Sequence, residues 1–306
     1  MRAVRHTTAG IEVLDVPEPI GPGAVVRVAS SGICGSDLHM LQWGPMPFTL
    51  GHEIGGRLDD GTPVAVWPSR PCGECDRCLA GEVQQCREGA RVYGSTYGDG
   101  GMAESVIVEQ RNIVPLPAGV DPSDAALVEP LACSIHAFHR GNVERNARVA
   151  VVGAGSIGLG AAAVARWLDC TVDVAARHPA QRAAATAMGA GVAAEGEYDV
   201  VVEAAGTSSA VETVFSLLRP GGTVIFVSTH WDPVTFPQFF TMKEPTIISA
   251  ATHHDTEMAD AAQLLADLPE VPRALITHRL PLDRAADAFA LAGDRASGAI
   301  KVVLEP

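Results

Sequence analysis

The sequence predicts an α/β protein with two domains, a doubly wound parallel sheet and a β-rich domain. Its 306 residues, 47% of them hydrophobic, are enough to bury two cores. As far as about Pro117 the chain is rich in Gly, Pro and short Val/Ile runs, which are typical of short strands joined by loops. From Pro122 onward, apolar strand-like runs alternate with Ala-rich helical stretches, which indicates a parallel sheet covered by helices.

The expected elements follow in chain order. Strands are expected in the first part at 23–30, 62–66 and 103–108, and an Ala-rich helix over 123–140. The later strands are expected at 148–152, 171–175, 199–203, 223–228 and 246–250. Helices are expected between them near 157–168, 179–188, 209–218 and 255–267. The last segment, 285–304, has the pattern of a helix, a turn at Gly298 and a strand that rejoins the first domain.

Charge and terminal composition exclude several classes of partner. The formal net charge of −14, with no Lys/Arg-rich run, would repel a nucleic-acid backbone. The N-terminus leads into strand-like sequence and has no apolar signal region, so a cytoplasmic location is expected. The most apolar stretch, 149–168, holds four glycines and Arg166, which indicates a buried strand and helix and no membrane span. The expected partner is a small-molecule substrate.

A glycine-rich turn after the first strand of the parallel sheet predicts a dinucleotide site. The run 149–152 leads into Gly153-Ala154-Gly155-Ser156-Ile157-Gly158 and then into a helix. Glycine at these positions permits the tight turn and the approach of backbone to a pyrophosphate, which the N–H groups of the helix N-terminus then face. The candidate cofactor-binding residues here are Gly153, Gly155, Ser156, Ile157 and Gly158.

The end of the second strand indicates which dinucleotide binds. NAD sites usually carry a carboxylate there for the ribose 2′-hydroxyl, but this chain has Arg177 and His178, and Asp173 lies inside the strand. An arginine is suited to a 2′-phosphate. We therefore expect NADP, with NAD as the alternative, and Ala205 after the third strand as a further cofactor contact.

Two short segments of the first part predict a catalytic metal site. Cys34, within 32–39, and His52, within 51–53, offer a thiolate and an imidazole, which suit zinc with three protein ligands and one open position. Glu129 is the first choice as third ligand, and Glu53 and Cys133 are the alternatives.

Four closely spaced cysteines predict a second metal site. Cys72, Cys75, Cys78 and Cys86 match a closed tetrahedral zinc site, which is structural because no ligand position stays open. An iron–sulfur site is less favoured, because no cluster-type Cys-Pro follows. Cys170 lies outside both groups and is expected in a core.

Taken together, these motifs resemble those of zinc-containing medium-chain dehydrogenases/reductases, the superfamily of alcohol, sorbitol and threonine dehydrogenases. The resemblance covers essentially the whole chain and includes 34–39, 51–53, 72–86, 99–101, 129–130 and the glycine turn. It implies a GroES-like catalytic domain over 1–133 and 275–306, with the structural zinc lobe at 72–86. It also implies a Rossmann dinucleotide-binding domain over 134–274.

The resemblance also implies a role for each residue. Cys34 and His52 would hold the catalytic zinc with Glu129, directly or through water, and the residue matching Glu53 approaches the metal in some states. Ser36 would hydrogen-bond the reacting oxygen, His39 would pass its proton to solvent, and Asp37 would orient His52. Ala132 stands where simple alcohol dehydrogenases carry a cysteine ligand, so the polyol-dehydrogenase pattern fits better.

The function expected from the resemblance is zinc-dependent hydride transfer between NADP(H) and an alcohol or polyol, or the matching aldehyde or ketone. Two zinc ions per chain and a homodimer or homotetramer are expected. The alternatives are a zinc-independent quinone or enoyl reductase of the same fold and a noncatalytic NADP-binding zinc protein. Segments 40–50, 55–63 and 189–199 are shorter than expected of the family, which leaves the substrate open.

Overall fold

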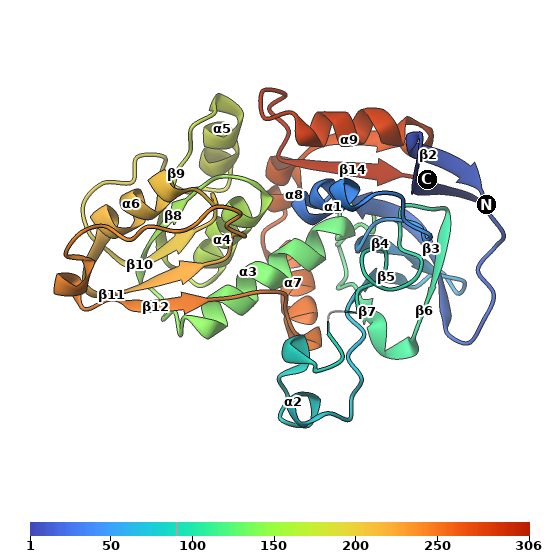
Figure 1. Ribbon diagram of the computed structural model, residues 1–306, viewed down its shortest axis with the longest axis horizontal. Helices are drawn as coiled ribbons and strands as arrows, with labels where there is room; N and C mark the ends of the chain where they lie inside the picture. Colours follow the sequence, from blue (N-terminus) through green and yellow to red (C-terminus); the bar gives the residue numbers. More distant parts are fainter. Residues whose placement is uncertain (90) are drawn as a thin grey trace. The chain divides into compact units, whose positions relative to one another are not determined.

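Two units make up the computed structural model, which describes residues 1–89 and 91–306 (Figure 1). The first comprises Met1–Glu129, His254–Ala266 and Ile276–Pro306, and the second comprises Pro130–His253 and Asp267–Leu275. One unit is β-rich and the other holds a parallel sheet, so the predicted fold class is confirmed. The assignment of catalysis to 1–133 with 275–306, and of dinucleotide binding to 134–274, stays a prediction about roles.

A five-stranded parallel sheet forms the centre of the second unit. Its strands are β8 (Arg148–Val152), β9 (Thr171–Ala175), β10 (Tyr198–Glu203), β11 (Leu218–Phe226) and β12 (Thr246–Ser249), in the order β12-β11-β10-β8-β9. The inner strands are apolar on both faces, as a sheet covered on both sides requires: Val149, Ala150 and Val151 are fully buried. The order reverses between β8 and β10, and ligands of such sheets bind at the carboxyl ends of the strands at this point.

Helices cover this sheet. They are α3 (Val128–Arg140), which begins at the end of the first unit, α4 (Ser156–Trp167), α5 (Pro179–Ala187), α6 (Ser208–Leu217), α8 (Glu270–Leu275) and the short η5 (Phe240–Lys243). The Ala-rich centre of α4 is buried where α4 packs on β8 and β9, and α6 packs on β8, β10 and β11. Small side chains therefore bring α4, which follows the glycine turn, close to the sheet.

The first unit is dominated by antiparallel strands. β1 (Arg2–Thr7) and β2 (Gly10–Asp15) form a hairpin. A second sheet has the order β13 (Ile276–Pro281), β14 (Lys301–Glu305), β3 (Ala24–Gly32), β4 (Glu53–Leu58), β5 (Pro63–Val66) and β7 (Ile113–Pro115), and β6 (Ser105–Val108) also pairs with β3. Because β14 pairs with β3, the C-terminal strand rejoins the first unit, as predicted.

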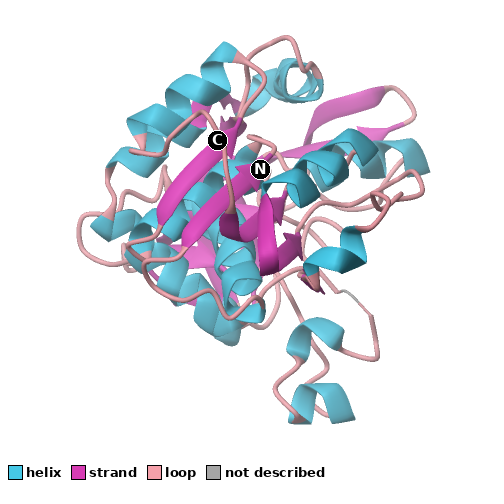
Figure 2. Ribbon diagram, turned by 90° about the vertical axis from the view of Figure 1, so that its left-hand side faces the viewer, coloured by secondary structure: helices cyan, strands magenta, loops and turns pink. Residues whose placement is uncertain are grey.

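The helices of the first unit are short, apart from two. They are α1 (Gly35–Met40), η1 (Leu41–Trp43), α2 (Asp76–Leu79), η2 (Val83–Gln85), η3 (Gln110–Asn112), η4 (Ala125–Leu127), α7 (Asp255–Asp267, whose last residue belongs to the second unit), η6 (Leu282–Arg284) and α9 (Ala285–Gly293). Residues 72–86, which we call the cysteine lobe, carry α2 and η2 and project from the rest of their unit in both views (Figures 1 and 2).

Strand register places the first candidate site. β3 and β4 pair antiparallel with Gly32 opposite Glu53. Cys34 follows β3 by two residues and is the N-cap of α1, whereas His52 directly precedes β4, so the register brings the two segments side by side. Gly32 is required here, because a Cβ at this position would collide with the Glu53 carboxylate.

Across residues 1–89 and 91–306, none of the helices combines the length and apolar character that crossing a bilayer requires.

Candidate active site

Three potential metal ligands meet where β3, α1 and β4 adjoin. One ligand atom each of Cys34, His52 and Glu53 lies within 4.8 Å of the other two. His52 and Glu53 are 6% and 1% exposed, whereas Cys34 is only half-buried. A thiolate, an imidazole and a carboxylate converging in this way match the donors that zinc takes in catalytic sites.

Asp37 orients both predicted ligands. Its Oδ2 accepts a hydrogen bond of 2.9 Å from the Cys34 backbone N–H, and its Oδ1 lies 3.3 Å from Nδ1 of His52. Burial lowers the pKa of His52, but Asp37 and Cys34 raise it by more, so that it lies well above its usual value. With Nδ1 facing a carboxylate, Nε2 of His52 is the nitrogen directed to a metal, as in carboxylate–histidine–zinc arrangements.

Ser36 and His39 lie on α1, in its first and last turns. The Ser36 hydroxyl lies 3.4 Å from Nε2 of His52, so the structure brings Ser36 to the group of ligands. His39 is half-buried one turn later on the same helix. These positions are compatible with the predicted roles, which are hydrogen bonding to the reacting oxygen for Ser36 and proton transfer for His39 and which stay predictions.

Sequence analysis missed Lys301, which binds the Glu53 carboxylate. The Lys301 ammonium lies 2.6 and 2.7 Å from the two carboxylate oxygens and 3.2 Å from the Ile33 carbonyl oxygen. Both side chains are 1% exposed. A lysine within the apolar run 300–304 was the available signal, since lysines are rarely fully buried without a partner.

Glu129, the first choice as third ligand, lies in the first turn of α3. It is not among the residues grouped with Cys34 and His52 in the described chain. Burial is the largest cause that raises the pKa of Glu53, and the charge of Glu129 raises it further. Cys133, the other alternative, follows one helical turn later on α3. The structure thus groups Glu53 with the two other ligands and places Glu129 near Glu53, and the identity of the third ligand stays a prediction.

The four cysteines of the cysteine lobe also converge. One ligand atom from each of Cys72, Cys75, Cys78 and Cys86 lies within 4.8 Å of the other three, and none forms a disulfide. The Sγ atoms of Cys72 and Cys78 are 3.8 Å apart. Tetrahedral zinc with Zn–S bonds of about 2.3 Å separates its sulfurs by about 3.8 Å, so the spacing fits a structural zinc.

Backbone N–H groups stabilise thiolates in this lobe. The amides of Cys72, Cys75 and Cys78 donate to Cys86, Cys72 and Cys75 sulfurs over 3.4, 3.4 and 3.5 Å. Hydrogen bonds from the amides of Arg87 and Cys78 lower the pKa of Cys75 to about 6, whereas burial raises that of Cys78 to about 12. Binding of a metal ion would require all four cysteines to be deprotonated, including Cys78.

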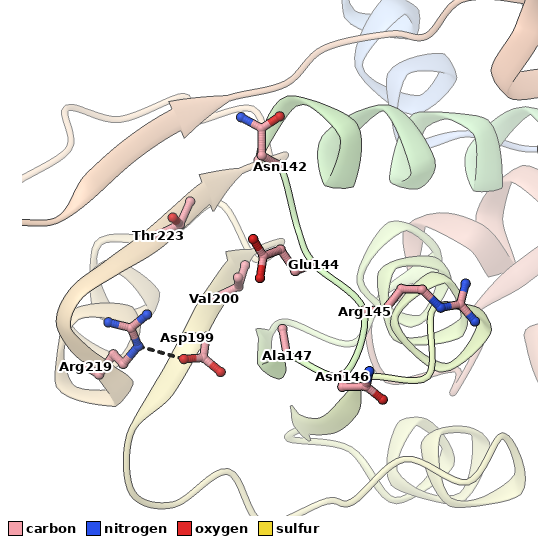
Figure 3. A pocket seen from close by; sticks show the side chains of 10 residues that line it. Asn142, Glu144, Arg145, Asn146, Ala147, Asp199, Val200, Arg219 and Thr223 are labelled. Atoms are coloured by element: carbon pink, nitrogen blue, oxygen red, sulfur yellow. Dashed lines mark hydrogen bonds and ion pairs between the residues drawn. The ribbon is translucent and has the colours of Figure 1, made fainter.

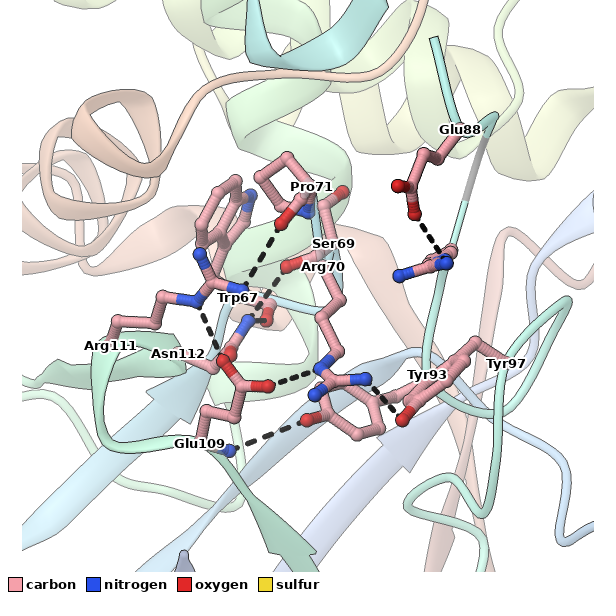
Figure 4. Close-up of polar contacts among 11 residues, drawn as sticks. Trp67, Ser69, Arg70, Pro71, Glu88, Tyr93, Tyr97, Glu109, Arg111 and Asn112 are labelled. Carbon is pink, nitrogen blue, oxygen red and sulfur yellow. Dashed lines mark hydrogen bonds and ion pairs between the residues drawn. The ribbon is translucent and has the colours of Figure 1, made fainter. Parts of the chain in front are cut away.

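A polar network fixes the chain where it enters the lobe (Figure 4). The fully buried Asn112 donates to the carbonyl oxygens of Trp67 and Ser69 over 2.6 and 2.8 Å, and Arg111 donates to that of Pro71 over 3.1 Å. Beside them, Arg70 binds Glu109 and the Tyr97 hydroxyl. The start of the lobe is therefore held by its unit independently of any metal.

The glycine turn of the second unit has the geometry predicted for a dinucleotide. Gly153 has a φ of +106°, and a Cβ there would come within 2.7 Å of the Ala204 carbonyl carbon and the Ala205 nitrogen. A Cβ on Gly158 would collide with the Gly153 carbonyl oxygen. A Cβ on Gly155 would meet nothing within 4 Å, so the space over the N-terminus of α4 is open to a pyrophosphate. Ser156 and Ile157 form the first turn of α4, as the predicted site requires.

The tip of β9 carries no free carboxylate. Arg177 is exposed, and its Nη2 donates to the Ser209 hydroxyl over 3.2 Å; the exposed His178 is the N-cap of α5. Asp173 instead accepts a hydrogen bond of 2.9 Å from the Tyr198 hydroxyl. Asp173 is therefore engaged inside the sheet, and Arg177 is an exposed cation at the tip, a group of the kind that suits a 2′-phosphate.

A polar pocket of about 400 Å³ lies at the other edge of the same sheet (Figure 3). It adjoins the amino ends of β8, β10 and β11 and includes Arg145, Asp199 and Arg219. None of the predicted site residues lines it, so it is separate from the dinucleotide site.

The chain is similar in sequence to known proteins. Residues 21–118 match the family described as alcohol dehydrogenase GroES-like domain, and residues 156–267 match the family described as zinc-binding dehydrogenase. The chain is 34% identical to L-galactonate-5-dehydrogenase of Escherichia coli K12 over 90% of this chain and 89% of the relative. It is 30% identical to L-idonate 5-dehydrogenase (NAD(P)(+)) of the same organism, over 90% of each.

Two solved structures are similar to this chain in fold and sequence. A structure from Sinorhizobium meliloti 1021, described as a zinc-binding dehydrogenase bound to NADP, has a TM-score of 0.87 and 30% identity, covering 100% of this chain and 99% of that one. The structure of L-idonate 5-dehydrogenase from Escherichia coli has a TM-score of 0.88 and 28% identity, covering 100% and 97%.

Proposed function

Since the chain belongs to the zinc-containing medium-chain dehydrogenase/reductase family, we propose that it is a zinc-dependent enzyme that passes hydride between an alcohol or polyol, or the matching aldehyde or ketone, and NADP(H). The observation that supports the site best is the convergence of Cys34, His52 and Glu53 within 4.8 Å. NADP in the Sinorhizobium structure and Arg177 at the tip of β9 support the choice of cofactor. The relatives named for L-galactonate and L-idonate support a polyhydroxylated substrate.

The proposed mechanism divides the work among residues of this chain. When bound, zinc supplies Lewis-acid polarisation of the substrate oxygen and nicotinamide supplies the hydride acceptor or donor. Cys34 as thiolate and His52 as neutral imidazole would hold the metal, and Asp37, whose Oδ1 lies 3.3 Å from Nδ1 of His52, would orient the His52 ring. Ser36, 3.4 Å from Nε2 of His52, would hydrogen-bond the reacting oxygen, and His39 would carry the hydroxyl proton of the substrate onward to solvent.

We propose that Glu129 completes the ligand set, directly or through water, with Glu53 and Cys133 as alternatives. Lys301 binds both oxygens of Glu53 at 2.6 and 2.7 Å and so competes with a metal for that carboxylate. The cysteine lobe would hold a second, structural zinc, which would give two ions per chain.

Replacing Cys34 by Ser tests the proposal. The variant should lose one of two zinc ions by metal analysis and should lose alcohol oxidation, while NADPH binding measured by fluorescence is unchanged. Cys170→Ser is the matched control, because Cys170 is a buried thiol outside both metal groups, and it should keep two ions and activity. Turnover retained by Cys34→Ser would refute the assignment of the catalytic metal.

A substrate screen would follow with alcohols, polyols, sugar acids, aldehydes and ketones, each with NADP(H) and NAD(H). A cytoplasmic homodimer or homotetramer also belongs to the proposal. Exposed apolar side chains in the second unit support self-association, namely those of Trp231, Phe239, Met242 and Ile247, which are 63%, 71%, 78% and 41% exposed.

A further inference from the structure

A buried carboxylate at the carboxyl edge of the parallel sheet holds a histidine that sequence analysis did not single out. Glu203 is the last residue of β10 and is fully buried. Its Oε1 accepts hydrogen bonds of 2.9 Å from the backbone N–H groups of Ala205 and Gly206. Its Oε2 accepts one from the Ser228 hydroxyl and lies 3.0 Å from Nε2 of His230.

These contacts fix the orientation of His230. A fully buried carboxylate is stable only when it is hydrogen-bonded, and Glu203 is bonded on both oxygens. Since Glu203 is an acceptor, Nε2 of His230 carries the proton in this contact. The ring also packs edge-to-face on Phe226, with centroids 5.7 Å apart. The imidazole is thus held from two directions, and its side chain is still 14% exposed.

The other ring nitrogen is available to a ligand. No residue within 1–89 or 91–306 forms a hydrogen bond with Nδ1 of His230, whereas Nε2 contacts both Glu203 and Ser228. A neutral imidazole protonated on Nε2 presents Nδ1 as an acceptor. The arrangement therefore offers one oriented acceptor at the surface of the second unit.

The position of His230 indicates which ligand this is. His230 follows the end of β11 by four residues. The turn after β10, which Glu203 holds through its carboxylate, lies against the glycine turn: a Cβ on Gly153 would come within 2.7 Å of the Ala205 nitrogen. Doubly wound sheets bind one mononucleotide over each half, on either side of the point where the strand order reverses. Arg177 follows β9, in the half that would take the adenosine, whereas β10 and β11 belong to the other half.

We infer that His230, fixed by Glu203, is a binding residue for the nicotinamide riboside half of the dinucleotide. Nδ1 would accept a hydrogen bond from a ribose hydroxyl or from the carboxamide nitrogen of that half. The inference rests on the proposed function, because it requires that a nicotinamide dinucleotide binds this unit.

Comparing a whole dinucleotide with its adenosine half tests the inference. NADPH would be titrated by nucleotide fluorescence and 2′,5′-ADP, which lacks the nicotinamide riboside, by calorimetry, both with the full chain. His230→Ala should weaken NADPH binding about tenfold, the loss expected for one hydrogen bond, and should leave 2′,5′-ADP binding within about twofold. His230→Phe keeps the packing on Phe226 without a polar atom and should show the same selective loss, even if the Ala variant folds poorly.

His278→Ala is the matched control, because His278 lies on β13 in the first unit, where its Nδ1 contacts the Thr277 hydroxyl; both affinities should stay within about twofold of the original. Equal weakening of NADPH and 2′,5′-ADP would overturn the inference, as would an unchanged NADPH affinity together with a raised KM for the alcohol. Failure of the unaltered protein to bind either ligand would overturn the proposed function and the inference with it.

Discussion

At the scale of residues, the ion pair between Lys301 and Glu53 connects stability to the metal site. Both side chains are buried, and they come from positions at opposite ends of the sequence. Burial lowers the pKa of Lys301, but the charges of Glu53 and Cys34 raise it by more, to a net value above normal. The stabilisation that Lys301 contributes is therefore complete at pH values below the pKa of a free lysine. It is lost only as the pH rises through the higher pKa that Lys301 has in the folded protein.

Removing one partner of this pair should be costly. Lys301→Met should lower the free energy of unfolding by about 3–5 kcal/mol, because it leaves the Glu53 carboxylate buried without its cation. The double variant Glu53→Gln/Lys301→Met should recover most of that loss, as measured by urea unfolding. Arg284→Met, which removes an exposed pair with Asp287, should cost no more than about 1 kcal/mol. If Lys301→Met and Arg284→Met lower the free energy of unfolding by the same amount, Lys301 does not stabilise a charged Glu53.

Arg177 should determine the preference for NADP. Arg177→Ala should weaken NADP binding about 10- to 100-fold, the loss expected for a charge-assisted hydrogen bond to a phosphate, with little change for NAD. Dissociation constants for both nucleotides provide the measurement. Arg219→Ala, at the opposite edge of the same sheet, serves as the comparison and should affect neither. Equal effects of Arg177→Ala on the two nucleotides would contradict the role given to this residue.

At the scale of elements, the thiols of the cysteine lobe differ in pKa, so their relative rates of alkylation test the structure of the lobe. In zinc-depleted protein at pH 7, about nine-tenths of Cys75 should be thiolate at its pKa of about 6, whereas Cys78, at about 12, stays protonated. Iodoacetamide should therefore label Cys75 first and Cys78 last, as mass spectrometry of the peptides would show. Zinc-loaded protein should be protected at both. Uniform labelling would mean that the lobe does not keep this structure without its metal.

The elements also show what sequence could and could not predict. Hydrophobic patterning placed the five parallel strands, because each contains closely spaced Val or Ile residues and helical segments separate several of them. The short strand β13 and the helix α8 were missed, since at six residues each they lack a distinct period. Spacing was enough to group Cys72 with the other lobe cysteines. It could not reveal that Gly32 faces Glu53, because strand register depends on pairing between distant segments.

At the scale of the whole molecule, the prediction was most complete for sites whose residues lie close together in the sequence and least complete for sites formed by distant segments. The glycine turn and the cysteine lobe each lie within a short stretch of chain. Lys301 and His230 bind carboxylates far away in the sequence, so neither role follows from neighbouring residues. The choice among Glu129, Glu53 and Cys133 depends on the same kind of long-range arrangement.

The shortened connection at 189–199 has a consequence for the sheet it adjoins. β9 ends the strand order, so one of its sides has no neighbouring strand. Gly191 bridges to Asp173 there, donating its N–H to the Val172 carbonyl oxygen over 2.9 Å and accepting from the Val174 amide over 2.8 Å. A single residue thus occupies two backbone groups of β9 that would otherwise be open to intermolecular β-pairing, and we expect the abbreviated loop to lower the tendency of this edge to aggregate.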